Sequence, residues 1–261
     1  MELLKYPRTH HIQGSRFQHG DEDLDDVPFS SIAGRHLVIE EKMDGANSAF
    51  SFNAEGKLLL QSRGHFLVGG EREKHFHLFK QWTSTHSRSF HDVLGSRYIC
   101  YGEWLYAKHT VFYDQLPHFF LEFDIFDREK NVFLSTERRI ELLAGLAVVS
   151  VTVLHSGKLK SHKELLSYLG PSKFISKNHL NNLKKQANRI GQKEELILKE
   201  TDQSNYMEGL YIKVEEDGIV KERYKFVRES FLTAVHESET HWLNRPIIPN
   251  ILQEGVSIHE N

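Results

Sequence analysis

Lys42 stands two residues before the pair Asp44 and Gly45, in a predicted tight turn between two apolar stretches. A lysine amine can attack a phosphorus atom once it has lost its proton, although the pKa of free lysine is about 10.4. Partial burial and neighbouring cations lower that pKa, and both occur naturally beside a nucleotide-binding site. The pattern is short, however, and a surface hairpin whose Lys42 and Asp44 are merely solvated explains it as well.

Two further patterns place a polar side chain at the end of an apolar stretch or inside one. Arg63 directly follows a predicted strand, where its forked donors could bind a ribose or phosphate oxygen. An ordinary strand-end turn explains Arg63 equally well. Glu103 lies within the apolar run from Tyr101 to Leu105. A carboxylate there is costly to bury unless it is paired or bound to a metal ion.

Aromatic and charged residues mark two later stretches. Phe119 and Phe120 begin an aromatic run from which a ring could stack on a base, although core packing explains most of these rings. Glu208 and Lys213 bracket another apolar strand. This second stretch therefore places a carboxylate and an amine at the two ends of an apolar strand.

A basic strand closes the series. Lys221, Arg223 and Lys225 alternate along the chain and therefore share one face of a strand. Three cations on one face repel one another unless an anion lies between them, and a triphosphate is such an anion. The alternative is a solvated edge strand.

The elements that must position these residues are strands that cluster, with helices between the clusters. We predict strands over residues 36–41, 47–52, 57–61, 98–104, 119–126, 210–214 and 219–227, some of them joined by Asp-Gly or Glu-Gly turns. We predict helices over residues 71–94, 137–144, 162–170, 176–190 and 229–243. This order indicates the α+β class with mainly antiparallel sheets flanked by helices.

Composition limits the class of protein and its partners. The chain has 261 residues with a net charge of −3, so a nucleic-acid site would have to be a local basic surface. Cys100 is the only cysteine, which excludes an internal disulfide and is typical of a reducing compartment. No apolar run approaches the roughly 20 residues that span a bilayer, and the N-terminus lacks a signal-peptide core. We expect a cytoplasmic protein without a membrane partner.

Histidines are numerous but not spaced as zinc ligands. The sequence has seventeen, including the groups His10, His11 and His19, then His65, His75 and His77. Zinc sites combine histidines with cysteines or carboxylates at helical or knuckle spacings, which do not occur here. We interpret these histidines as surface, core or phosphate-contacting residues.

In order, Lys-x-Asp-Gly, Ser-Arg-Gly, Gly-Glu, Phe-x-x-Phe-Asp, Glu-Gly-x-x-x-Lys and the basic strand resemble the signature of covalent nucleotidyltransferases. That superfamily contains ATP-dependent RNA ligases, DNA ligases and mRNA capping enzymes. The resemblance runs from about Glu40 to Lys225. It implies the nucleotidyltransferase fold, which is the ATP-grasp-like adenylation domain of ligases.

Within the superfamily the chain most resembles RNA ligases that seal nicks in duplex RNA, since these carry an asparagine where Asn47 stands. Only 36 residues follow Lys225, so we expect no oligonucleotide-binding barrel. The opening segment, residues 6–16, is similar to that of a compact bacterial subgroup. We expect an adenylation domain over residues 1–228, followed by a short helix and tail over 229–261. The basic helix around Lys184, Lys185 and Arg189, or a partner protein, could replace a further RNA-binding domain.

The resemblance implies an ATP-dependent RNA ligase that joins RNA ends bearing a 3′-hydroxyl and a 5′-phosphate, possibly in a nicked duplex. Lys42 would accept AMP from ATP, the AMP would pass to the 5′-phosphate, and the 3′-hydroxyl would displace it. The alternatives are a ligase or nucleotidyltransferase that acts on DNA or another acceptor, and a non-catalytic nucleotide- or RNA-binding module. Against the last, a binding module has no need of a lysine nucleophile.

The resemblance also implies a role for each residue. The catalytic residues would be Lys42, Asp44, Arg223 and Lys225. Glu41 would lie against the adenine, Phe120 or its neighbour Phe119 would stack on it, Arg63 and Glu103 would hold the ribose, and Lys213 and Lys225 would contact phosphate. Glu208, with Glu103, would hold Mg²⁺ or Mn²⁺, and Asn47 would contact the RNA. The basic pair could be Lys221 with Arg223 or Arg223 with Lys225.

Overall fold

A computed structural model describes residues 2–17, 21, 23–231 and 246–258. Most of the helix expected over residues 229–243 therefore lies outside the described residues, as does His19. No helix in the described part of the chain combines the length and the apolar character needed to cross a lipid bilayer.

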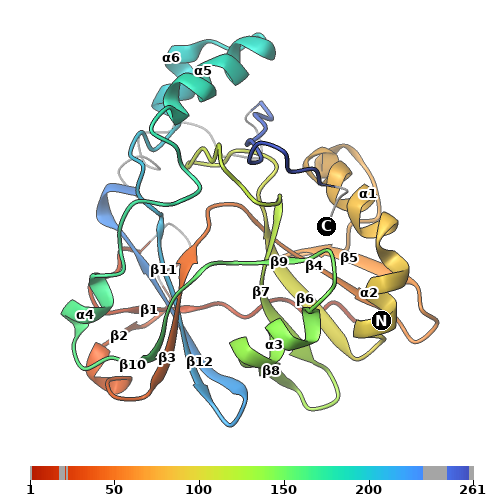
Figure 1. The fold of residues 1–261 in the computed structure, drawn as a ribbon, viewed down its shortest axis with the longest axis vertical. Helices are drawn as coiled ribbons and strands as arrows, with labels where there is room; N and C mark the ends of the chain where they lie inside the picture. The colour runs from red at the N-terminus through yellow and green to blue at the C-terminus, as the bar shows by residue number, and fades with distance from the viewer. Residues whose placement is uncertain (1, 18–20, 22, 232–245, 259–261) are drawn as a thin grey trace.

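Twelve strands of the described chain form one strongly curved, mainly antiparallel sheet with two halves (Figure 1). One half contains β10 (Val153–Lys158), β3 (His36–Lys42), β11 (Gly209–Glu216) and β12 (Ile219–Val227), in this order. The other contains β7 (Phe120–Asp127), β6 (Tyr98–Trp104), β4 (Ala46–Phe52) and β5 (Leu58–Ser62). β8 (Val132–Leu134) joins the halves by pairing with both β12 and β7. The α+β prediction is confirmed.

Three short strands complete the sheet. β1 (His10–Ile12) runs parallel to β12 and to β2 (Asp26–Val27). β9 (Val149–Ser150) runs parallel to β7. None of the three was predicted, and neither were β8 and β10. Most of β10 is only partly buried or exposed, so it lacks the alternation of apolar and polar residues that identifies a strand in sequence.

Alternation along β3 and β11 separates an apolar face from a charged one. Ile39 and Ile212 are paired and point into one core, which α4 (His162–Leu166) and the 3₁₀ turn η1 (Phe29–Ser31) cover. Glu40, Lys42 and Lys213 lie on the opposite face, toward the other half of the sheet. The fold thus places charged side chains between the two halves.

Helices cover the outer face of the second half of the sheet (Figure 1). They are the 3₁₀ segment η2 (Glu71–Phe76), α1 (His77–Thr85) and α2 (Ser87–Leu94). The single helix predicted over residues 71–94 is therefore divided, because the backbone at His86 (φ −97°, ψ 9°) leaves the helical region. Trp82 and Phe90 pack against Phe50 of β4 and form the centre of an aromatic core.

Three of the remaining helices begin near the predicted positions, and α6 (Glu194–Lys199) was not predicted. Ser135 caps α3 (Thr136–Leu143), and Ser161 caps α4, because each hydroxyl accepts a backbone N–H of the first turn. α5 (His179–Arg189) and α6 form a hairpin that stands at one end of the molecule (Figure 1). Leu183, Ala187 and Ile197 belong to a small separate core beneath this hairpin.

The N-terminal segment lies against the interior side of the sheet, although its sequence predicts only irregular polar chain. The Tyr6 side chain is buried, and its hydroxyl hydrogen-bonds the carboxylate of Asp124 and the hydroxyl of Tyr211. The carbonyl of Leu4 accepts hydrogen bonds from the Tyr101 hydroxyl at 2.7 Å and from a side-chain amide of β5 at 2.8 Å. Residues 4–6 therefore tie the two halves together.

Candidate functional site

Lys42 ends β3 where the chain turns toward β4, and its side chain is a quarter exposed (25%). Its Nζ donates a hydrogen bond of 2.7 Å to Oε1 of Glu208, which directly precedes β11. The register explains this meeting, because Gly209 pairs with Lys42 across the two strands. Two residues that are far apart in sequence thus form a contact at the ends of adjacent strands.

Glu103 completes the group from the other half of the sheet. It lies on β6, and its charge and that of Asp44 both act on the Lys42 amine. Burial is the main cause that raises the pKa of Glu103 to about 8, with a contribution from the charge of Glu208. Burial is also the main cause that raises the pKa of Glu208 to about 7, with a contribution from the charge of Asp44. Burial lowers the pKa of Lys42, but Glu208, Glu103 and Asp44 together raise it above its ordinary value.

These carboxylates are suitable ligands for a hard divalent cation. Oε2 of Glu208 is buried without a hydrogen-bond partner in the described structure, and such an oxygen is costly to leave unpaired. Mg²⁺ prefers carboxylate oxygens and usually keeps waters or substrate phosphates as its other ligands. Among the described residues no three His, Cys, Asp or Glu side chains form a group that could hold a metal ion by themselves.

Asp44 fixes the turn that carries Lys42. Its Oδ2 accepts the backbone N–H groups of Thr110 and Val111, both at 2.7 Å, and its own N–H donates to the hydroxyl of Tyr113 at 2.9 Å. Charge-assisted bonds of this kind are short and strong. The carboxylate thus binds the loop beneath the turn, and its described contacts position Lys42.

Two glycines beside the carboxylates are required by close packing. A Cβ on Gly102 would overlap the ring of Phe120, and a Cβ on Gly209 would overlap the backbone carbonyl of Phe226. The glycine in each of the Gly-Glu and Glu-Gly patterns is therefore required because a neighbouring ring or strand leaves no room for a Cβ.

We expect Gly209→Ala to lower the free energy of unfolding by about 1–3 kcal/mol or more, the range for overpacking a core, because its obstacle is backbone. Urea denaturation measures this change. Gly64→Ala is the matched control, since nothing lies within 4 Å of the position its Cβ would take. An equal effect of the two substitutions would contradict the packing argument.

Lys225 approaches the group from β12. Its Nζ lies 2.6 Å from Oδ2 of Asp21, and the charges of Lys42 and Glu208 both act on it. Burial lowers the pKa of Lys225. Asp21 also hydrogen-bonds Nε2 of His11 at 3.1 Å, so an acidic side chain of the N-terminal segment neutralises this lysine.

The other two cations of the basic strand have different surroundings. Arg223 donates from Nε to Asp124 at 3.2 Å, and its guanidinium carbon lies 3.7 Å from the ring centroid of Phe133. Lys221 is more exposed and lies 4.0 Å from Asp217 in the β11–β12 turn. The described partners of Arg223 are Asp124 and Phe133, so a contact of Arg223 with the substrate stays a prediction. Of the three cations, Lys225 is the one whose pKa is affected by the charges of Lys42 and Glu208.

Lys213 lies in the interior between the two halves of the sheet. It is fully buried and donates to the carbonyl of Phe123, and its Nζ forms ion pairs of 3.0 Å with both Glu40 and Asp124. These contacts hold the two halves of the sheet together. A contact of Lys213 with phosphate stays a prediction.

The same interior contains a buried arginine. Arg139 of α3 is fully buried and forms ion pairs with Glu40 of β3 and with Glu122 of β7, the latter at 2.5 Å. Glu40 thereby connects Arg139 with Lys213. A network of opposite charges thus lies behind the Lys42 site and joins four elements, α3, β3, β7 and β11.

The ring of Phe120 belongs to the aromatic core, and its stacking on a base stays a prediction. It is fully buried and packs on Phe79 and Trp82, with ring centroids 5.4 and 5.3 Å away. Phe119, the alternative, lies in a different place: its ring meets those of Trp104 and Tyr106.

The last three predicted residues differ in exposure. Glu41 is buried, its Oε1 has no hydrogen-bond partner in the described structure, and burial raises its pKa to about 7. Asn47 is partly buried and pairs with Glu103 on the neighbouring strand. Arg63 is exposed after β5, and the described structure gives it no ion pair. The structure thus brings Asn47 beside the carboxylates and leaves Arg63 open at the edge.

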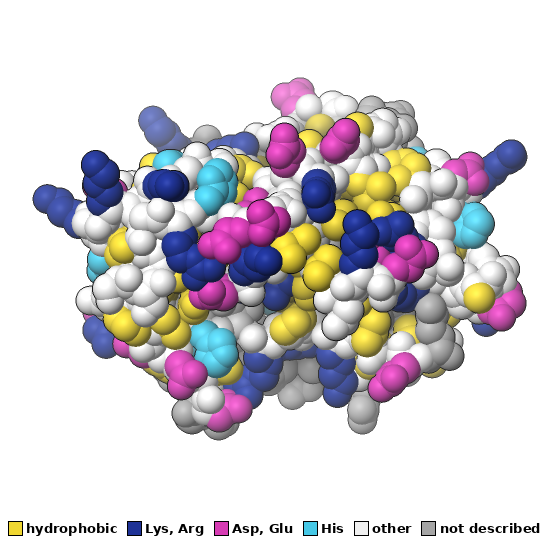
Figure 2. Space-filling view, turned by 90° about the horizontal axis from the view of Figure 1, so that it is seen from below, with side chains coloured by type: hydrophobic (Ala, Val, Ile, Leu, Met, Phe, Trp, Pro, Cys, Tyr) yellow, Lys and Arg dark blue, Asp and Glu magenta, His cyan; other side chains and the backbone are white. Residues whose placement is uncertain are grey.

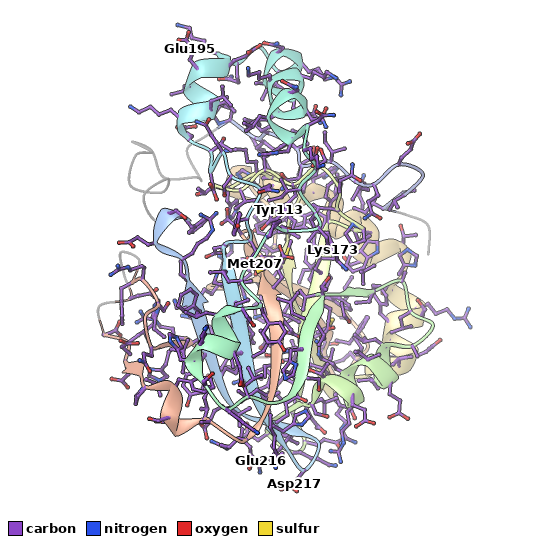
Figure 3. All side chains as sticks on the ribbon, turned by 60° about the vertical axis from the view of Figure 1, so that its left-hand side comes forward. Tyr113, Lys173, Glu195, Met207, Glu216 and Asp217 are labelled. Carbon is purple, nitrogen blue, oxygen red and sulfur yellow. The ribbon has the colours of Figure 1, made fainter. Side chains whose placement is uncertain are left out.

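The sequence did not reveal Tyr113 or Asp21 as parts of the site. Tyr113 is fully buried, and burial raises the pKa of its hydroxyl well above 10. Figure 3 shows Tyr113, Lys173 and Met207 gathered at the end of the strands that is remote from Glu216 and Asp217. Met207 directly precedes Glu208, so this is the end that carries the site. The acidic run from Asp21 to Asp26 was the available signal for Asp21, since a basic strand needs a counter-charge.

A comparison with protein-family models supplies an independent finding. The model described as RNA ligase matches residues 35–227, about three quarters of the chain. The matched region begins just before β3 and ends with β12, and so contains every residue of the Lys42 group. A search among curated proteins finds no significant match.

Solved structures share the fold at low sequence identity. A mutant of the Naegleria gruberi RNA ligase with ATP and Mn superposes with a TM-score of 0.54 at 16% identity, over 88% of this chain and 58% of that one. An archaeal ATP-dependent RNA ligase superposes with a TM-score of 0.51 at 13% identity, over 88% and 49%. The chain thus spans roughly half the length of these structures. The likeness shows the ligase adenylation-domain fold that the sequence led us to expect.

Proposed function

The chain belongs to the RNA ligase family, and on that premise we propose that it is an ATP-dependent RNA ligase whose residues 1–228 are an adenylation domain. It joins a 3′-hydroxyl to a 5′-phosphate through AMP bound covalently to Lys42 and then to the 5′ end. The observation that carries this proposal is a lysine held at 2.7 Å from one buried carboxylate and beside a second.

In the first step the amine of Lys42 attacks the α-phosphorus of ATP, forms an N–P bond and releases pyrophosphate. The amine needs its lone pair for this attack, whereas the carboxylates hold its pKa above the ordinary value. A change of charge around Glu208 must therefore accompany nucleotide binding. Glu41, buried and with an unpartnered oxygen, is available to accept a hydrogen bond from the exocyclic amine of adenine.

Glu208 and Glu103 would hold Mg²⁺ or Mn²⁺, since both are carboxylates in a site with an unpaired buried oxygen. When bound, the cation supplies positive charge that neutralises phosphate oxygens. The Naegleria gruberi RNA ligase with ATP and Mn supports this choice of partners. The residues themselves contribute orientation, because the turn at Asp44 fixes Lys42 and the register of β11 places Glu208 beside it.

Lys225 would contact phosphate, which requires that it leave Asp21. We expect Asp21→Asn to lower the KM for ATP in the AMP-transfer step by about 3- to 10-fold, because the carboxylate competes with phosphate for the same ammonium. Steady-state transfer of label at several ATP concentrations measures this. Asp23→Asn is the control, since Asp23 pairs with exposed Arg8 and not with Lys225. A raised KM for Asp21→Asn would contradict the competition.

After the AMP transfer, the 5′-phosphate of the RNA attacks the phosphorus of lysyl-AMP, and the N–P bond breaks. The 3′-hydroxyl of the second RNA end then attacks the activated 5′-phosphate and releases AMP. Asn47, beside Glu103 on the neighbouring strand, would contact the end that carries this hydroxyl.

Two labelling experiments test the proposal. The protein is incubated with Mg²⁺ and either α-labelled or γ-labelled ATP, and acid-labile label should appear on the chain from the α position only. Labelled protein is then mixed with nicked duplexes that carry RNA or DNA on either side of the nick. Absence of label would reject the enzyme and leave a binding module, and equal sealing of all-DNA nicks would reject the RNA assignment.

A further inference from the structure

A groove lies between α5 and the segment after residue 246. Figure 1 shows α5 and this segment above the strand ends that carry the Lys42 site. The volume of the groove is about 400 Å³. Asn182, Lys185, Gln186 and Arg189 line one wall, and Ile251 and Leu252 line the other. Cavities of this size hold small ligands, and this one has room for about one nucleotide.

The helical period explains the polar wall. The α5 positions 182, 185, 186 and 189 are three and four residues apart and therefore share one face. Leu183 and Ala187 lie on the opposite face and pack into the small core beneath the hairpin. The face that is free of core contacts is thus the one that lines the groove.

A hydrogen-bonded loop connects the groove with the nucleophile. The carboxylate of Asp114 accepts from Asn182 at 2.8 Å and from the backbone and hydroxyl of Ser176, and so fixes α5 to the loop that contains Tyr113. The hydroxyl of Tyr113 accepts from the N–H of Asp44, in the turn after Lys42. The groove therefore keeps a fixed position relative to the site of AMP transfer.

The charges of α5 have one sign. Its sequence, HLNNLKKQANR, holds three Lys or Arg residues and no Asp or Glu. Lys185 and Arg189 are exposed, and neither has an ion pair with a described residue. Two acidic residues, Asp114 and Glu254, also line the groove, and the carboxylate of Asp114 is engaged by Asn182 and Ser176. On the face at the other end of the molecule, by contrast, Figure 2 shows Lys and Arg side chains interspersed with Asp and Glu.

We propose that this groove holds a nucleotide of the RNA strand close to the ends being joined, an inference that rests on the proposed function. Lys185 and Arg189 contact its phosphates, and Asn182 and Gln186 offer amide donors and acceptors to the base edge or the ribose hydroxyl. Ile251 and Leu252 give the base an apolar wall. An RNA strand matches all three kinds of surface, whereas a free anion would use only the cations.

Charge reversal of the cationic wall tests the proposal. Lys185→Glu with Arg189→Glu should weaken binding of a nicked RNA duplex at least about 10-fold, measured by fluorescence anisotropy without ATP. Lys185→Gln with Arg189→Gln should reduce the slope of log K against log salt by about 2, one unit for each phosphate contact. The control, Lys57→Glu with Lys130→Glu, makes the same change of net charge at two exposed turns of the other half of the sheet.

The outcomes separate this inference from the proposed function. Unchanged RNA affinity in both groove variants, or equal weakening in the control, would overturn the groove assignment. Transfer of AMP onto each variant without RNA reports the state of the nucleotide site independently. If the wild-type chain binds RNA through the groove but accepts no AMP, the proposed function fails and the RNA surface stands.

Discussion

Alanine at position 42 should reduce transfer of AMP from α-labelled ATP to the chain by at least about 1,000-fold, because in the proposed reaction the Lys42 amine forms the covalent bond. The fold should survive the change. The side chain of Lys42 is a quarter exposed, and Glu208, which loses its partner, already has a pKa raised to about 7 and can bind a proton instead. Acid-labile label on the purified variant measures the loss.

A preformed 5′-adenylylated RNA provides the matched control for the Lys42 variant. Sealing of this substrate no longer needs an amine nucleophile, so the variant should retain far more of this activity than of AMP transfer. Equal loss in both assays would mean that Lys42 supports the structure of the site and is not its nucleophile. Label on the alanine variant would exclude Lys42 as the attachment point.

Replacement of Arg139 by methionine should lower the free energy of unfolding by about 3–5 kcal/mol, the largest expected effect on stability. Arg139 is fully buried between Glu40 and Glu122, and methionine fills similar volume but leaves two buried carboxylates without their partner. Urea denaturation at pH 7 measures the change. Arg16→Met, which removes an exposed pair with Glu229, should cost only about 0–1 kcal/mol.

The physical reason behind the Arg139 prediction can be tested separately. Adding Glu40→Gln and Glu122→Gln to the methionine variant removes the unpaired charges and should restore part of the lost stability. If these additions destabilise the variant further, the cost came from lost packing around α3 and not from unpaired charge. The comparison also shows how much stability is lost when Lys213 loses its ion pair with Glu40.

Several site residues could be selected from the sequence because they lie next to turns or glycines that end a strand. Lys42, Glu103 and Glu208 each adjoin a turn or a crowded glycine at a strand end, and strand ends of one sheet meet. The turn at Asp44 to Gly45 and the caps at Ser135 and Ser161 are local signals, which depend on neighbouring residues alone. Such local signals can be recognised in the sequence without knowledge of the tertiary structure.

The face on which a side chain lies could not be predicted where the sheet is irregular. The pairing of β6 with β7 shifts between Tyr101 and Gly102, which leaves Phe123 as an extra residue in its strand. A bulge of this kind reverses the alternation beyond it, so Phe120 points into the helix-covered core. The surroundings of Lys213 could not be predicted either, because Glu40 and Asp124 come from two other strands and only the curvature of the sheet brings them together.

The order of the strands has a consequence for synthesis of the chain. β4, β5, β6 and β7 pair with neighbours in sequence, so this half of the sheet can form early on the ribosome. Lys42 and Glu208 are 166 residues apart, and His10 pairs with Tyr224 in a parallel register that closes only at the end. Contacts between residues so far apart in sequence are slow to form. Lys42 therefore acquires Glu208 late, and a chain interrupted before β11 carries Lys42 and Glu103 without this second carboxylate.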